Sequence, residues 1–130
     1  MSSATFWPIL VAAVSSFVIG GLWYSPMLFE KVWNAENGGV PPPGHPARVF
    51  GTSLVFSLVA AACFSVLLGP SPELVHALKI GALVGIGLVA ASFGINYQFA
   101  QRSLKLWLVD GGYHVVQFLV FGLVFGLWGA

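Results

Sequence analysis

Four long apolar segments dominate this chain of 130 residues. They cover about residues 6–24, 49–68, 78–100 and 106–128, and each reaches the ~20 mostly apolar residues that a helix needs to cross a bilayer. The segments are continuous rather than alternating between apolar and polar residues, which excludes the pattern of membrane β-strands. The sequence therefore predicts an all-α fold, a single integral membrane domain over residues 1–130 in the form of a four-helix bundle.

The composition supports a membrane protein and excludes other classes. Hydrophobic residues make up 58% of the chain and charged residues only 7%, whereas a soluble domain carries roughly 25% charged residues. The net charge of +1 leaves no basic patch for neutralising phosphates, so we expect no nucleic-acid partner. Cys63 is the single cysteine and cannot form a disulfide or a cysteine metal site by itself. We expect membrane lipid as a partner, and neither a metal nor a cofactor.

The first connection contains signals for a short helix. Ser25 and Pro26 form a typical helix start, because Ser caps free N–H groups and Pro needs no donor there. The pattern predicts an interfacial helix over about residues 26–36, with its apolar face on the membrane surface. A stiff linker rich in Pro and Gly follows over residues 37–47.

The basic residues predict the orientation of the chain. Lys31 and Arg48 flank the first connection and Arg102 and Lys105 lie in the third, while only Lys79 lies near the second. Basic residues concentrate in cytoplasmic connections. We therefore expect a multi-pass protein of the cell (inner) membrane with both termini outside. No basic residue precedes Lys31, so the first segment is interpreted as a retained span rather than a signal peptide.

The fourth segment carries a polar stripe. Asp110, His114 and Gln117 follow the spacing i, i+4, i+7, which places them on one side of a helix. Ionisable residues within a span are costly unless they face the interior or water. We expect Asp110 and His114 to lie within hydrogen-bond reach, directly or through one water. The alternative is a structural tie in which Asp110 pairs with one of the nearby basic residues Lys105, Arg102 or Arg48.

Small residues mark the predicted contacts between helices. Gly81 and Gly85 share one face of the third segment with Ser92 and Asn96, and the fourth segment carries a second glycine pair four residues apart. Such pairs allow helix backbones to approach closely. The favoured interpretation is helix packing within the chain, and the alternative is a face for a second copy. The packing residues are Gly81, Gly85, Gly122 and Gly126.

Polar side chains from all four segments concentrate at one end of the predicted bundle. This pattern predicts a polar cup that opens to the cytoplasm, and the alternative is that polar residues simply gather at helix ends. The candidate ligand-binding residues are Trp23, Tyr24, Ser25, Asn96, Asp110, Tyr113, His114 and Gln117.

Two runs of the sequence support a resemblance. The run from Gly20 to Trp33 and the run from Leu106 to His114, about eighty residues apart, resemble the two motifs of a bacterial family of small four-helix membrane proteins. That family is catalogued as domain of unknown function 1761. The resemblance covers essentially the whole chain and implies four spans, but brings no established activity. The residues that it emphasises are Trp23, Tyr24, Ser25, Pro26, Asp110, Tyr113 and His114.

Three functions remain open at the level of the sequence. The first is a non-enzymatic module that binds a small ligand, a lipid or a proton in the cup, as a homo-oligomer or as a subunit of a larger complex. The second is a small channel or transporter. The third is a membrane enzyme in which Asp110 and His114 act as an acid–base pair, since a carboxylate-oriented imidazole can move protons near neutral pH. No nucleophile motif or phosphate loop accompanies that pair.

Overall fold

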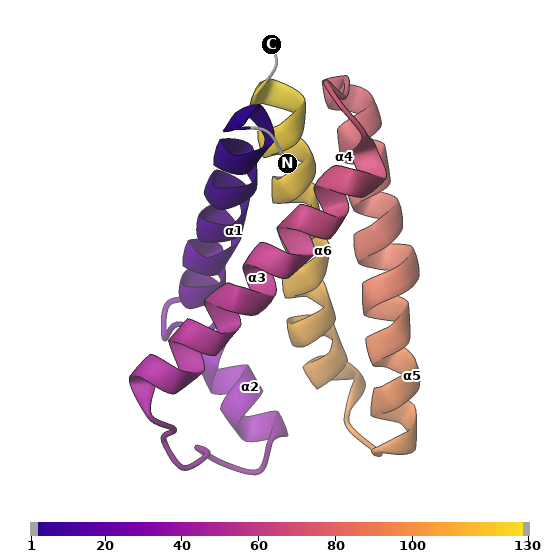
Figure 1. The fold of residues 1–130 in the computed structure, drawn as a ribbon. Helices are drawn as coiled ribbons and strands as arrows, with labels where there is room; N and C mark the ends of the chain where they lie inside the picture. Colours follow the sequence, from indigo (N-terminus) through magenta and orange to yellow (C-terminus); the bar gives the residue numbers. More distant parts are fainter. Residues whose placement is uncertain (1–2, 129–130) are drawn as a thin grey trace.

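The computed structural model describes residues 3–128, which contain helices and no strand. Figure 1 shows the helices α1 (Ser3–Trp23), α2 (Glu30–Glu36), α3 (Pro46–Leu68), α4 (Leu74–Ala82), η1 (Leu83–Ala90), α5 (Ala91–Phe99) and α6 (Leu104–Trp128). The elements α4, η1 and α5 follow one another without a break. They form one long helix.

Four helices are long and apolar enough to cross a membrane, over Phe6–Trp23, Pro46–Leu68, Leu74–Phe99 and Leu104–Trp128. This confirms the predicted all-α class with four membrane-capable helices. The third begins at Leu74, about one turn before the predicted start, because Glu73 has the extended backbone of a helix N-cap. The start of α1, the end of α6 and the α3–α4 turn lie at one end of the molecule, and α2 lies at the other (Figure 1).

The helix in the first connection is shorter than predicted. It begins at Glu30 rather than near Pro26, because Ser25 does not cap it. The Ser25 hydroxyl donates back to the carbonyl of Leu22 at 2.6 Å. The Ser25 carbonyl accepts from the backbone N–H of Leu28 at 3.0 Å, which closes a turn instead of a helix.

The contact between α4 and α6 brings the two backbones together. A Cβ atom on Gly122 would lie 2.5 Å from the carbonyl oxygen of Ala77, and one on Gly81 would lie 2.5 Å from that of Phe118. One turn further along α6, at the start of α4, a Cβ on Gly126 would lie 2.7 Å from the Cα of Leu74. Only glycine permits this approach. The glycine pairs therefore lie at a contact within the chain, and Gly85 faces the Cα of Val115 in the same contact.

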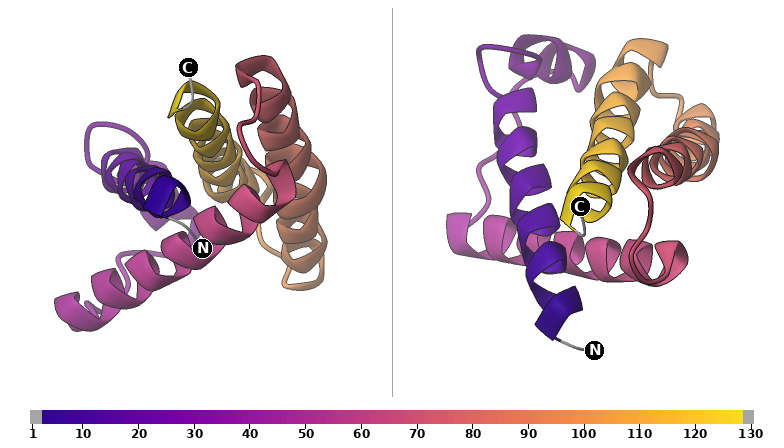
Figure 2. Two further views of the ribbon diagram at one scale, coloured as in Figure 1. Left: turned by 45° about the horizontal axis from the view of Figure 1, so that its top comes forward. Right: turned by 90° about the horizontal axis from the view of Figure 1, so that it is seen from above.

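Helix α3 lies differently from the other long helices. Both views in Figure 2 show it running obliquely across α1 and α6. The second half of α3 packs through Phe64, whose ring lies 5.7 Å from that of Phe118 and 6.0 Å from that of Phe121 on α6. The first half touches α1 through Phe50 and Phe17, with ring centroids 6.1 Å apart. Its distance from α6 therefore increases toward its beginning.

The π-helix η1 changes which residues of the long helix face α6. A π-helix joins residues i and i+5, so each turn holds one residue more than an α-turn. Residues beyond η1 are therefore displaced around the axis by about one position. The predicted face is correct at Gly81 and Gly85 but wrong at Ser92 and Asn96, which lie on the exposed surface.

Candidate functional site

The Asp110 carboxylate joins four segments of the chain. Its Oδ1 accepts a hydrogen bond from the Tyr24 hydroxyl at 2.6 Å and one from Trp33 Nε1 at 3.1 Å. Its Oδ2 accepts from the Tyr97 hydroxyl. These donors come from the residue after α1, from α2 and from α5, while Asp110 belongs to α6. We call Asp110, Tyr24, Trp33 and Tyr97 the carboxylate cluster.

The two sequence motifs interlock beside this cluster. Trp23 Nε1 donates to the carbonyl of Val109 at 2.9 Å, which places its ring against Gly112. A Cβ on Gly20 would lie 3.0 Å from the Tyr113 hydroxyl. That hydroxyl donates to the Ser16 carbonyl on α1 at 2.9 Å. Each motif supplies the large aromatic rings that fill the glycine gaps of the other.

The charge of Asp110 is held by neutral donors. Within residues 3–128 the carboxylate forms no ion pair with Lys105, Arg102 or Arg48, and Arg102 instead donates to Asn37. Tyr24 follows the last residue of α1. Burial raises the pKa of its hydroxyl, and the hydrogen bond to Asp110 and the negative charge there raise it further, so the hydroxyl stays a proton donor.

His114 has a different partner from the one expected. Its Nδ1 lies 2.7 Å from Oε1 of Gln117, and no direct hydrogen bond joins it to Asp110 in the part of the chain that the structure describes. The donors of the carboxylate cluster already engage both oxygens of Asp110. The imidazole ring is packed edge-on by Phe93 and Tyr113, each with its centroid 4.9 Å away. The ring is therefore fixed on three sides.

A cavity of about 700 Å³ lies between α1, α3, η1 and α6. It occupies the space that the oblique path of α3 leaves open. Apolar side chains form most of its wall, among them Phe17, Phe50, Phe56 and Phe118. The polar side chains along it are Tyr24, Ser53, Ser57, Tyr113, His114 and Gln117. Tyr24 belongs both to this wall and to the carboxylate cluster.

The candidate residues from the sequence fall into separate groups. Trp23 and Asp110 belong to the interlocked motifs, and Tyr24, Tyr113, His114 and Gln117 line the cavity. Among the described residues the Ser25 side chain bonds only to the carbonyl of Leu22 on its own helix. Asn96 is exposed, and its neighbour Tyr97 reaches Asp110 because η1 displaces the helix face.

Trp33 and Tyr97 are donors of the carboxylate cluster that the sequence did not predict. Trp33 lies on the apolar face that was expected to lie on the membrane, but its indole N–H reaches the carboxylate instead. A buried indole N–H needs a hydrogen-bond acceptor, and this requirement could have indicated that Trp33 binds a polar group of the protein. Residues 3–128 bring together no three His, Cys, Asp or Glu side chains that could hold a metal ion.

The helices and the site define an all-helical protein whose four long apolar helices are compatible with a multi-pass membrane protein. The chain belongs to the family described as "Protein of unknown function (DUF1761)", whose model matches residues 7–126. The resemblance drawn from the two motifs is thereby confirmed. No curated protein and no solved structure matches the chain.

Proposed function

We propose that this protein is a non-enzymatic membrane module that binds a small, mostly apolar ligand in the cavity beside His114. The observation that carries the proposal is a polar group placed on an apolar wall. His114 lines the cavity, and its second ring nitrogen, Nε2, has no hydrogen-bond partner among residues 3–128. A ligand that reaches this nitrogen would complete its hydrogen bonding.

The chemistry of the wall defines the class of ligand. A volume of about 700 Å³ falls within the range of roughly 300–1,000 Å³ of small-molecule pockets, which are mostly apolar with a few polar groups. Gln117 can present either its carbonyl or its amide group to Nδ1, so Nε2 can donate or accept. A ligand with an apolar body and one hydroxyl or carbonyl group fits these properties.

The catalytic alternative receives less support than binding. An acid–base pair requires the carboxylate to orient the imidazole, but Gln117 orients His114 and three other side chains hold Asp110. The cluster instead supports a structural role for Asp110. Self-association or membership of a larger complex remains part of the proposal, and the molecular mass in mild detergent tests it.

Native mass spectrometry of the purified protein tests the binding proposal. We expect the wild type in a mild detergent to retain a small molecule that His114→Leu loses. His76→Leu is the matched control, because His76 is an exposed histidine on α4 outside the cavity. Ala60→Phe places a large ring in the cavity and leaves His114 unchanged, so this variant should also release the molecule. Retention by both cavity variants, or no bound molecule in the wild type, contradicts the proposal.

The orientation with α2 in the cytoplasm belongs to the same proposal and rests on the distribution of basic residues. In a Cys63→Ala background, Val40→Cys and Glu73→Cys place single thiols in the first and second connections. We expect a membrane-impermeant reagent added to intact cells to label only Glu73→Cys. Labelling of Val40→Cys alone would show the opposite orientation. Equal labelling of both variants would contradict the four-span topology.

A further inference from the structure

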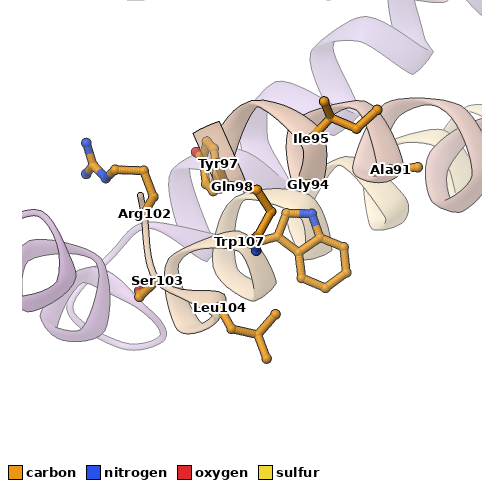
Figure 3. Close-up of a pocket in the computed structure, with 9 residues that line it drawn as sticks. All are labelled: Ala91, Gly94, Ile95, Tyr97, Gln98, Arg102, Ser103, Leu104 and Trp107. Atoms are coloured by element: carbon orange, nitrogen blue, oxygen red, sulfur yellow. The ribbon is translucent and has the colours of Figure 1, made fainter. Parts of the chain in front are cut away.

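We propose that a second site, at the turn between α5 and α6, binds an anionic phospholipid of the surrounding membrane. Figure 3 shows this groove, which has a volume of about 400 Å³. It shares no lining residue with the cavity beside His114. Figure 3 places Arg102 at one end of the groove and the side chains of Ile95 and Trp107 toward the other.

The apolar part of the groove lies along α5. Ala91, Gly94 and Gln98 line it at helical spacing along α5, so the groove follows the helix axis. Ala91 contributes only a small side chain, and Gly94 lets the Trp107 ring lie against α5, because a Cβ there would be 3.3 Å from Nε1. The Trp107 ring forms a fixed wall, since its Nε1 donates to the carbonyl of Ala90 at 2.8 Å. An acyl chain that runs beside a membrane helix has this direction and this chemistry.

The polar end of the groove carries positive charge. Arg102 and Ser103 line it between the end of α5 and the start of α6, and Lys105 lies exposed two residues further on. The hydrogen bond to Asn37 holds the Arg102 side chain in place. A guanidinium group has five N–H donors, so others remain for a phosphate. The nearby Asp110 carboxylate is engaged by its own three donors rather than by Arg102.

The position of the charges relative to the apolar wall favours a phospholipid as the ligand. The basic residues follow the last turn of one membrane-capable helix and begin the next, which is the depth of lipid headgroups. Basic pockets between membrane helices bind anionic headgroups. A phospholipid satisfies both ends at once, with its phosphate at Arg102 and Lys105 and one acyl chain along Ala91 and Gly94.

Lipid binding in nanodiscs of stated composition tests this inference. We expect the protein to enrich phosphatidylglycerol over phosphatidylcholine in its bound lipid, measured by native mass spectrometry. Each basic residue near an anionic lipid is worth on the order of fivefold in affinity, so Arg102→Gln with Lys105→Gln should lower the preference by about thirtyfold. Arg48→Gln with Lys31→Gln removes the same charge outside the groove and should retain it.

A third variant keeps the test decisive if the double variant fails to fold. Gln98→Glu adds a negative charge on the exposed part of the groove and should also weaken binding of phosphatidylglycerol. Equal loss in the control variant would show that only the overall charge matters, and would overturn the site. An unchanged preference in Gln98→Glu and in the double variant would also overturn it. The result is independent of His114, so the two proposals can fail separately.

Discussion

Two parts of α6 are held closely by other helices, whereas a third part borders a cavity. At Gly122 and Gly81 the backbones of α6 and α4 touch, and at Asp110 one carboxylate gathers donors from three other segments. Between these places α6 presents His114 and Gln117 to the space that α3 leaves. The comparison teaches that polar residues one helical turn apart can have unlike tasks, one holding the fold and the other facing an opening.

The glycine contact should give the largest effect. Gly122→Leu places a branched side chain where a Cβ already meets the backbone of Ala77 at 2.5 Å. The helices must separate, so we expect the free energy of unfolding to fall by more than about 4 kcal/mol. Gly51→Leu is the control, because no atom lies within 4 Å of a Cβ there. Equal stability of the two variants in detergent unfolding would contradict the close contact.

The carboxylate cluster should give the next effect. Asp110→Asn keeps the size of the side chain but removes the charge that three donors address. Hydrogen bonds to charged groups are worth about 1.5–3 kcal/mol each, and we expect a net loss of about 3 kcal/mol in unfolding free energy. Glu36→Gln, on α2 but outside the cluster, should change stability little. If Asp110→Asn left the unfolding free energy unchanged, the carboxylate cluster would not stabilise the contacts between these segments.

A smaller effect distinguishes the two neighbours at the end of α5. Tyr97→Phe removes one hydroxyl from Asp110 and should lower the unfolding free energy by about 1 kcal/mol. Asn96→Ala removes an exposed side chain and should change it by less than about 0.5 kcal/mol. A larger stability loss in Asn96→Ala than in Tyr97→Phe would place Asn96 on the inner face. It would also show that α5 continues in the register of an uninterrupted α-helix.

The cavity side should change stability by no more than Tyr97→Phe does. His114→Leu loses the hydrogen bond to Gln117 but gains apolar area on an already apolar wall. We expect its unfolding free energy to stay within about 1 kcal/mol of the wild type. If His114→Leu lost as much unfolding free energy as Asp110→Asn in ligand-free protein, His114 would be a structural residue like Asp110. The contrast between the two residues would then be wrong.

The class of the fold and the importance of the two motifs could be predicted from the amino-acid sequence alone. Continuous apolar runs of membrane length have few alternatives to helices, because each backbone polar group must find its partner within the segment. The spacing of glycines predicted small-residue packing, and the two motif runs pointed to the family that the chain belongs to. These properties are local, so a single sequence can contain them.

Which side chains meet became known only from the packing of the helices. The i, i+4 spacing favours a contact between Asp110 and His114, yet donors from three distant segments engage the carboxylate instead. Periodicity placed Asn96 inward, but the wide turns of η1 bring Tyr97 to that position. The oblique path of α3, which opens the cavity, depends on packing between helices. Hydrogen bonds and crossing angles between segments follow from the whole set of neighbours, and helical spacing describes one segment at a time.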